Sequence, residues 1–253
     1  MMQEITSTFR PDLFAGKRVL VSGASTGIGA AIARGFAVLG AEVVATGSSP
    51  HKLDAARADP ANAGIRFEQL DVRDRAAVDA FVGALPSLDV LVNSAGIVKP
   101  DLEYEEEPYL EVIDVNLNGA MRLSMAAYPL LKASRGAIVN TASMLSFLAD
   151  ERVPAYGASK TGIMGLTRAL AHRFGADGIR VNAIAPGYHK TDMTKDLWTH
   201  DEHGPTIARK AALKRWGTVE DLVGTVVFLA SPASVFVTAT TLPVDGGYVV
   251  SGW

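Results

Sequence analysis

The chain has 253 residues, of which 48% are hydrophobic, and its 24 glycines and 12 prolines fit a single α/β domain with many tight turns. It has no cysteine, which excludes disulfides and cysteine-ligated metals, and we predict no metal site of another kind. The formal net charge of −3 provides no basic field for nucleic acid or anionic lipid.

Residues 1–15 read as a polar N-terminal extension that is broken by Pro11 and lacks the apolar core of a signal peptide. No stretch approaches the ~20 uninterrupted apolar residues that a membrane span needs. We therefore expect a soluble cytoplasmic protein with no membrane or nucleic-acid partner.

Residues 18–22 form an apolar run of strand length, followed by a glycine-rich loop and a helical pattern that ends at Gly40. Glycines let a backbone approach a pyrophosphate closely, and the free N–H groups at a helix N-terminus bind its charge. A plain structural turn is the alternative interpretation. The order of strand, loop and helix favours a dinucleotide site formed by Gly23, Ser25, Thr26, Gly27, Ile28 and Gly29.

The second expected strand, residues 41–46, runs into Gly47 and Ser48. This position offers neither an acid for a ribose diol nor an arginine for a 2′-phosphate, and Ser48 can hydrogen-bond either group. The cofactor is therefore NAD or NADP. A third strand, residues 65–70, ends at Asp71 and Val72, where Asp71 either accepts from an adenine amino group or caps a turn.

The fourth expected strand, residues 88–92, is almost continuously apolar, as in a parallel sheet covered on both faces. Its end carries a short loop, residues 93–96, through which a ligand can approach the backbone. Asn116 then interrupts an apolar helical run and predicts a local irregularity, because asparagine competes for backbone hydrogen bonds. The fifth strand, residues 137–142, delivers Ser143.

Tyr156 and Lys160 are four residues apart and share one face of a long helix. A free phenol titrates near pH ~10, and a cation at about 6 Å in a dielectric of about 20 favours the phenolate by roughly 3 kcal/mol. The pair thus predicts a general acid/base with a lowered pKa, the alternative being a solvated helix face. Three glycines in this helix predict close packing against it: Gly157, Gly162 and Gly165.

The sixth strand, residues 179–185, is closed by Pro186 and Gly187. Residues 188–215 have weak periodicity and are interpreted as a lid that excludes water, with a mobile surface insertion as the alternative. A final strand and turn follow at residues 241–247. The tail, residues 248–253, is apolar and should pack against its own chain or a neighbouring subunit.

From about residue 16 onward the chain resembles the short-chain dehydrogenase/reductase family. The motifs that carry the resemblance are Gly23-xxx-Gly27-x-Gly29, Asn93-Ser94-Ala95-Gly96, Asn116, Ser143, Tyr156-xxx-Lys160 and Pro186-Gly187. Ser94 departs from the family, which usually has a second asparagine there. The resemblance implies one doubly wound Rossmann-type domain over residues 1–253, with about seven parallel strands, helices on both faces and a homotetrameric assembly.

The resemblance also implies roles for the site residues. Tyr156 would exchange a proton with the substrate oxygen while hydride moves between the carbinol carbon and the nicotinamide. Ser143 would hydrogen-bond the same oxygen, Lys160 would lower the phenol's pKa and hold the ribose, and Asn116 would maintain a helix kink and a water. Further cofactor contacts are expected from Asn93, Ala95, Gly96, Tyr156, Lys160, Pro186, Gly187 and Thr191.

Within the family, residues 142–147, 152–156 and 182–188 resemble the sugar-acid and polyol branch, including gluconate dehydrogenases. A sugar acid needs a cation for its carboxylate. Arg152, His189, Lys99 and Lys190 lie in loops near the expected pocket and could supply it. The substrate contacts that we predict are Met144, Arg152, Tyr188 and His189. The alternatives are a 3-oxoacyl-carrier-protein reductase, a non-catalytic nucleotide-binding regulator, and an isomerase or dehydratase that borrows the cofactor.

Overall fold

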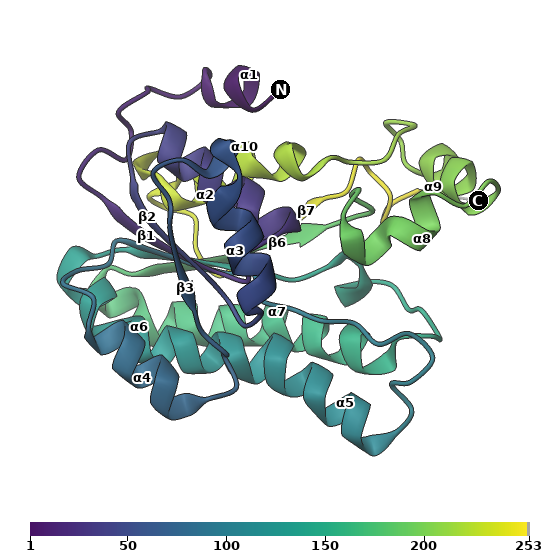
Figure 1. Ribbon diagram of the computed structural model, residues 1–253, viewed down its shortest axis with the longest axis horizontal. Helices are drawn as coiled ribbons and strands as arrows, with labels where there is room; N and C mark the ends of the chain where they lie inside the picture. Colours follow the sequence, from purple (N-terminus) through teal and green to yellow (C-terminus); the bar gives the residue numbers. More distant parts are fainter. Residues whose placement is uncertain (252–253) are drawn as a thin grey trace.

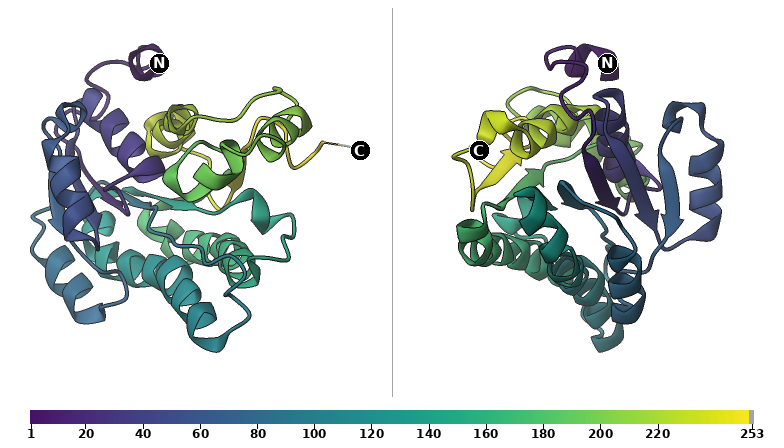
Figure 2. Two further views of the ribbon diagram at one scale, coloured as in Figure 1. Left: turned by 45° about the vertical axis from the view of Figure 1, so that its right-hand side comes forward. Right: turned by 90° about the vertical axis from the view of Figure 1, so that its left-hand side faces the viewer.

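The structure is a computed structural model in which residues 1–251 are described. Seven strands form one sheet in the order β3-β2-β1-β4-β5-β6-β7, and every neighbouring pair is parallel. Strands β3 and β7 are the two edges of the sheet (Figure 2). The strands are β1 (Arg18–Ser22), β2 (Glu42–Gly47), β3 (Arg66–Gln69), β4 (Val90–Asn93), β5 (Ala137–Thr141), β6 (Arg180–Pro186) and β7 (Thr241–Val244).

Helices cover both faces of this sheet (Figure 1). One face carries α2, α3 and α10, and the other carries α4, α6 and α7, with α5 leading into α6. The helices are α1 (Met2–Thr6), α2 (Gly27–Val38), α3 (Pro50–Ala58), α4 (Arg75–Gly83), α5 (Glu106–Ile113), α6 (Gly119–Ser134), α7 (Pro154–Phe174), α8 (Lys195–Trp198), α9 (His203–Lys210) and α10 (Val223–Ala230). The predicted doubly wound α/β fold with about seven strands is therefore confirmed.

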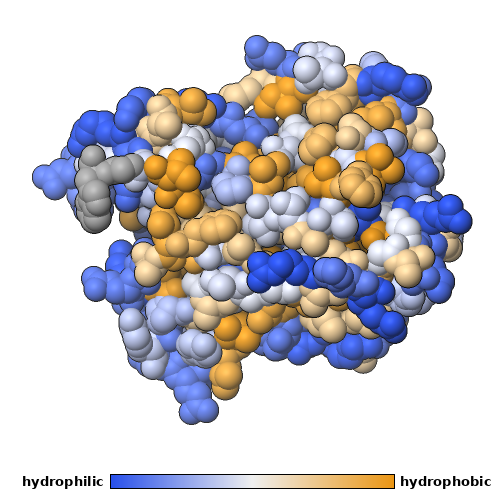
Figure 3. Space-filling model, turned by 180° about the vertical axis from the view of Figure 1, so that it is seen from behind, coloured by the Kyte–Doolittle hydropathy of each residue, from blue (hydrophilic) through white to orange (hydrophobic). Residues whose placement is uncertain are grey.

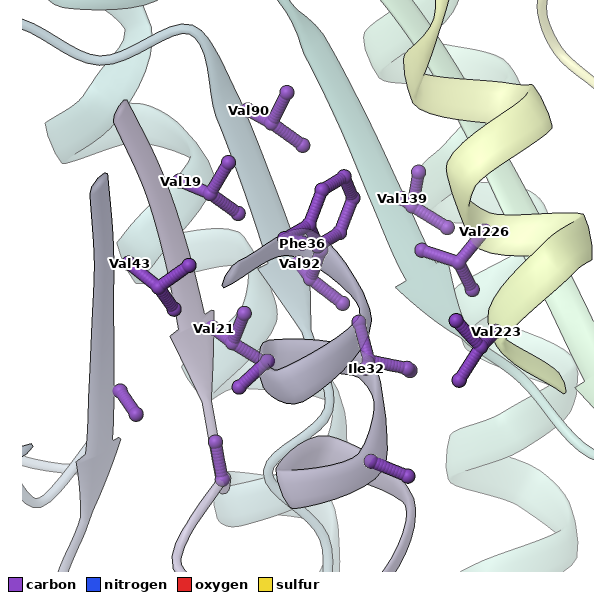
Figure 4. Packing of buried hydrophobic residues seen from close by; sticks show 14 of the residues in the cluster. Val19, Val21, Ile32, Phe36, Val43, Val90, Val92, Val139, Val223 and Val226 are labelled. Carbon is purple, nitrogen blue, oxygen red and sulfur yellow. The ribbon is translucent and has the colours of Figure 1, made fainter. Parts of the chain in front are cut away.

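Each central strand buries both of its faces because successive side chains point to opposite sides. In β1, Val19 and Val21 pack with Phe36 of α2 and Val223 of α10 (Figure 4). Leu20, between them, belongs to the core under α4 and α6. This two-sided burial explains the nearly continuous apolar runs in the strands of the sequence.

The two ends of the chain pack on the domain in different ways. Helix α1 lies against α2 and α10, and Phe14 is 3% exposed, so the N-terminal extension is part of the folded unit. In the predicted apolar tail, Tyr248 packs edge-on against Tyr188 with ring centroids 5.1 Å apart, whereas Val250 is 85% exposed. Gly252 and Trp253 lie outside the described residues. No helix in residues 1–251 is long and apolar enough to cross a membrane.

Two local expectations have clear outcomes. Residues Asp114–Asn118 form a π-helical turn between α5 and α6, which confirms the irregularity predicted at Asn116. Close packing at the glycines of α7 is found at Gly162, where a Cβ would come 2.8 Å from Leu117 Cδ2. At Gly165 no atom of this chain outside the neighbouring helix backbone lies within 4 Å of the Cβ position, so close packing by a ligand or another subunit there stays a prediction.

The chain order of the strands reverses between β1 and β4, since β2 and β3 lie on one side and β5 to β7 on the other. In open parallel sheets, ligands bind at such a switch point, outside the carboxyl ends of the strands. A ligand-binding site is therefore expected among the residues that follow these strand ends.

Candidate active site

A cavity of about 240 Å³ lies at the switch point. Its walls come from the loops after the first four strands, together with Glu111 and Val115. Eight of the residues predicted to bind a cofactor line it: Gly23, Ser25, Thr26, Ser48, Asp71, Val72, Ala95 and Gly96. Sequence motifs that lie far apart along the chain thus converge on one concave surface.

The glycine-rich loop is built for close backbone approach. Gly23 has φ +65°, and a Cβ on it would lie 2.5 Å from the Cα of Ala95. A Cβ on Gly29 would lie 2.4 Å from the carbonyl oxygen of Gly23. Helix α2 begins at Gly27 directly after this turn, so its free N–H groups face the cavity rim. The cradle and the helix N-terminus together fit the pyrophosphate of a dinucleotide.

The remaining predicted cofactor residues surround this cradle. Thr191 approaches the loop within 3.8 Å of the Cβ position of Gly27. Gly187 packs against Asp245, where a Cβ would lie only 2.6 Å from the aspartate Cβ. Asn93 is buried and donates to Asn140 Oδ1 at 2.8 Å, so its side chain joins the carboxyl ends of β4 and β5.

Asp71 and Ser48 lie on the cavity wall at the predicted adenosine end. The carboxylate of Asp71 accepts from the Arg73 guanidinium at 2.7 Å and from the Arg73 backbone N–H at 2.9 Å. The guanidinium keeps the pKa of Asp71 below its usual value. Asp74, and not Asp71, caps helix α4 by accepting from Ala77 N–H at 3.0 Å. Ser48 is exposed and free to turn toward a ligand.

The predicted catalytic residues lie beside the part of the cavity formed by Gly96, whose Cβ position is 3.4 Å from Asn116 Oδ1 and 3.5 Å from Lys160 Nζ. Asn116 Oδ1 accepts from Ile97 N–H at 2.8 Å, and its Nδ2 donates to Ser159 Oγ at 3.1 Å. Ser159 Oγ in turn donates to the carbonyl oxygen of Tyr156 at 2.8 Å. The π-helical turn at Asn116 is therefore tied to both the loop after β4 and the Tyr156 turn of α7.

Lys160 is 4% exposed, and its Nζ lies 5.5 Å from the centroid of the Tyr156 ring. The same Nζ donates to the carbonyl oxygen of Thr141 at 2.8 Å. Ser143, two residues beyond Thr141, is 6% exposed, its Oγ accepts from the backbone N–H of Leu145 at 3.1 Å, and its hydroxyl acts to lower the pKa of the Tyr156 phenol. The four predicted catalytic residues are thus brought together by β5, α7 and the π-helical turn.

The expected lowering of the Tyr156 pKa was wrong for the protein without cofactor. Burial raises the pKa of the Tyr156 phenol, the Ser143 hydroxyl counteracts this, and the Glu103 carboxylate raises it further. Burial also lowers the pKa of Lys160 to about 8, so the lysine is only partly charged near that pH. Desolvation is the largest cause of both shifts, and the spacing of the two residues in the sequence does not reveal it.

The predicted substrate residues have more varied environments. Met144 is 5% exposed, and Tyr188 packs against Trp216 with ring centroids 5.3 Å apart. Arg152 is exposed and bound to Asp101, with Nη2 2.6 Å from Oδ2. His189 is 4% exposed, lies against Gly217, and its Nδ1 is 3.1 Å from the carbonyl oxygen of Gly187.

Two cations considered for a substrate carboxylate are also engaged. Lys99 is paired with Glu111, which is in turn 3.1 Å from Arg73. Lys190 lies over the ring of Trp198, 5.5 Å from its centroid. Within residues 1–251, therefore, Arg152 and Lys99 each have a carboxylate partner that a substrate would have to replace.

Several residues of the site had not been predicted from the sequence. Arg73, Ser49 and Lys52 line the cavity, and Ser159 and Thr141 hold the catalytic pair through hydrogen bonds. Glu103 is fully buried and accepts from the backbone N–H of Tyr156. A glutamate in a strongly polar stretch gives no local signal of such burial.

A doubly wound sheet, a glycine cradle at its switch point and a pair formed by a half-buried tyrosine and a buried lysine define the class of dinucleotide-dependent oxidoreductases. Residues 23–249 match the family model described as enoyl-(acyl carrier protein) reductase. The chain belongs to the short-chain dehydrogenase/reductase family.

Curated relatives and solved structures resemble the chain over nearly its whole length. Gluconate 5-dehydrogenase of Gluconobacter oxydans is 38% identical over 252 residues, covering 95% of this chain and 98% of that protein. 2-Dehydro-3-deoxy-D-gluconate 5-dehydrogenase of Bacillus subtilis is 39% identical, covering 92% and 95%. The structure of a gluconate 5-dehydrogenase from Burkholderia cenocepacia in complex with NADP and tartrate has a TM-score of 0.87 and 32% identity, covering 96% and 98%.

Proposed function

We propose that the protein is an NAD(P)-dependent dehydrogenase that interconverts a secondary alcohol and a ketone on a sugar acid of the gluconate type. The observation that carries the proposal is the group formed by the buried Ser143 and Lys160 and the half-buried Tyr156 beside a glycine-lined cavity. Support for the substrate class comes from the relatives, which are named as gluconate and deoxygluconate 5-dehydrogenases.

The residues of the chain fit a catalytic cycle of this kind. When bound, the nicotinamide would accept hydride from the carbinol carbon in oxidation and donate it to the carbonyl carbon in reduction. In the oxidation direction, Tyr156 as phenolate takes the hydroxyl proton, and in the reduction direction it returns that proton to the carbonyl oxygen. Ser143 donates a hydrogen bond to the same oxygen as charge develops on it. Lys160 keeps a positive charge close to the phenolate at neutral pH.

The cofactor residues fit either NAD or NADP. The glycine cradle accommodates the pyrophosphate that both share, and Ser48 and Lys52 lie at the wall where the two cofactors differ. Relatives of known structure have been solved with NADP, including the Burkholderia enzyme. The adenine contact of Asp71 and the carboxamide contact of Thr191 remain predictions.

We also propose that residues 188–215 act as a lid over the substrate. This segment contains α8 and α9, joined to the cofactor side through Trp198, whose Nε1 donates to the carbonyl oxygen of Thr191 at 3.2 Å. Closure would exclude water from the hydride-transfer step and bring Tyr188 to the reacting carbon. The substrate contacts of Met144, Arg152, Tyr188 and His189 belong to this proposal.

A homotetramer in the cytoplasm is the assembly and location that we propose. Support comes from apolar side chains on two surfaces: Leu110, Met121 and Met125 on α5 and α6, and Val235 and Phe236 after α10. Phe236 is fully exposed in the single chain. Apolar patches are visible on the face that carries α7 and β7 (Figure 3). The lack of cysteine suits a reducing compartment.

A substrate panel tests the function. The purified protein is mixed with gluconate, 2-dehydro-3-deoxygluconate, a neutral polyol or a 3-oxoacyl thioester, each with the oxidised or reduced form of NAD and of NADP as the reaction requires, and nicotinamide absorbance is followed. We expect the highest kcat/KM with a sugar acid. A preference for the thioester would instead support a 3-oxoacyl-carrier-protein reductase, an activity for which a Rickettsia bellii relative with 36% identity is named. Cofactor binding without turnover of any substrate would favour a regulator.

A further inference from the structure

Glu103 stands out among the acidic residues near the site because its side chain is completely buried. Its Oε1 accepts from the backbone N–H of Lys99 at 2.8 Å, and its Oε2 accepts from the backbone N–H of Tyr156 at 2.8 Å. Tyr156 lies in the first turn of α7, where backbone N–H groups have no partner within the helix. Glu103 therefore caps this helix from a point 53 residues earlier in the chain.

Of the other acids near this turn, Asp150 and Glu151 are exposed to solvent, and the rest are paired with cations. Asp101 binds Arg152, and Glu111 binds Lys99 and Arg73. Asp114 binds Arg122 at 2.7 Å. Within residues 1–251, Glu103 takes part in no such ion pair, and its two oxygens bind only backbone N–H groups. Burying a carboxylate without a cation costs folding free energy. A stabilising role alone therefore does not explain a glutamate at this position next to the catalytic tyrosine.

The two ends of the segment 97–103 are fixed to the same turn of α7. Ile97 is held by Asn116, which reaches the carbonyl oxygen of Tyr156 through Ser159. Glu103 binds the N–H of Tyr156 at the other end of the segment. Residues 94–97 line the dinucleotide cavity, so this double attachment joins the cofactor wall to the residue that carries the phenol.

We propose that Glu103 is a positioning residue for Tyr156: its buried carboxylate fixes the first turn of α7 to the loop that lines the cofactor cavity and so sets where the phenol stands relative to the nicotinamide. The inference rests on the proposed function only in that Tyr156 exchanges the substrate proton. Glu103 itself contacts neither substrate nor cofactor.

The charge of Glu103 also acts on Tyr156 and provides a readout that a purely structural role would not change. The groups that act on the phenol are Lys160 from α7, Ser143 from the end of β5, and the charge of Glu103, whose oxygens themselves bind backbone N–H groups in the loop after β4 and in α7. The Glu103 carboxylate raises the pKa of the phenol, so a neutral side chain at this position should let it ionise at lower pH.

Two variants separate geometry from charge. Glu103→Gln removes the charge and leaves one of the two N–H groups facing an amide NH₂, which cannot accept. Glu103→Asp keeps the charge but shortens the side chain. We expect kcat to fall about 10- to 100-fold in both, with little change in cofactor Kd measured by fluorescence titration. The kcat/KM for alcohol oxidation rises with pH as the phenol ionises. For Glu103→Gln alone, the midpoint of this rise should lie about one pH unit lower than in the wild type.

The matched control is Glu105→Gln, which removes one charge from an exposed side chain in the same loop and should leave both readouts unchanged. A titration of phenolate absorbance, with the Tyr156→Phe protein subtracted in each background, needs no substrate and should show the same downward movement. Thermal unfolding reports how much of each variant is folded.

Three results would overturn the inference. The first is a Glu103→Gln protein whose phenolate titration matches the wild type. The second is a loss of kcat that the folded fraction fully accounts for. If Glu103→Gln does not fold, the third applies: a folded Glu103→Asp protein with undiminished kcat. The proposed function fails differently, because the wild-type protein would then turn over no sugar acid while the titration still shifted.

Discussion

Lys160 Nζ donates a hydrogen bond to the carbonyl oxygen of Thr141 at 2.8 Å, which ties the catalytic helix α7 to the end of strand β5. Ser143, whose hydroxyl acts to lower the pKa of the Tyr156 phenol, follows two residues later, just after the end of β5. One strand end therefore fixes Lys160 and Ser143, two of the polar groups next to the phenol. Four predictions follow from this arrangement and from the loops around it.

The first prediction concerns stability as a function of pH. Burial lowers the Lys160 pKa from 10.5 to about 8, so an ionised Lys160 costs about 3 kcal/mol of folding free energy at pH 7. Between these two pKa values the unfolded chain binds the proton and the folded chain does not, so stability rises with pH in this window. We expect urea unfolding to show the wild type gaining about 3 kcal/mol relative to Lys160→Met between pH 7.5 and 10.5. A flat difference would mean that Lys160 keeps its ordinary pKa.

The second prediction tests the proton donor. Tyr156→Phe removes only the hydroxyl, and the ring keeps its packing in the first turn of α7. We expect kcat to fall by about 10²–10⁴-fold or more, with cofactor Kd nearly unchanged. Steady-state kinetics and fluorescence titration measure the two quantities. Ser159→Ala, which loses the bond to the Tyr156 carbonyl oxygen, is a control in which catalysis should fall much less. Turnover retained in Tyr156→Phe would rule out the acid–base role.

The sequence was sufficient to predict the sheet and the core of the site. Residues 18–22 and 88–92 are apolar runs between turn residues. Such runs are typical of central strands that are buried on both faces of a parallel sheet. Parallel strands place their carboxyl ends on one edge of the sheet, so Gly23, Asp71, Gly96 and Ser143 were bound to lie along that edge. Asn116 marked its own irregularity because asparagine is unfavourable inside a helix.

What the sequence could not predict depends on partners that lie far away along the chain. The bond between Glu103 and Tyr156 spans 53 residues, and that between Arg152 and Asp101 spans 51. No periodicity or spacing reports such pairs. The direction of the Tyr156 pKa was missed for the same reason, since burial by distant elements decides it. Helices α8 and α9 were not predicted either, because they are short and the segment 188–215 has no clear periodicity.

The third prediction concerns recognition of the substrate carboxylate. The ion pair between Arg152 and Asp101 is exposed to solvent, so a bound carboxylate could replace Asp101 at little cost. We expect Arg152→Ala to raise KM for a sugar acid by about tenfold and KM for a neutral polyol by much less. Asp101→Asn is the informative partner variant: by freeing Arg152 it should leave KM for the acid unchanged or lower. Equal effects of Arg152→Ala on both substrates would refute the carboxylate contact.

The fourth prediction tests the glycine cradle. Gly23 combines φ +65° with a Cβ position 2.5 Å from the Ala95 backbone, so an added methyl group must displace the loop after β4. We expect Gly23→Ala to cost about 1–3 kcal/mol of unfolding free energy and to raise cofactor Kd at least tenfold. Gly83→Ala is the matched control, because that glycine ends α4 with no atom within 4 Å of its Cβ position. Its alanine should be neutral or stabilise by up to about 1 kcal/mol. Denaturant unfolding and fluorescence titration of both variants measure the difference, and undiminished cofactor affinity in Gly23→Ala would show that the pyrophosphate lies elsewhere.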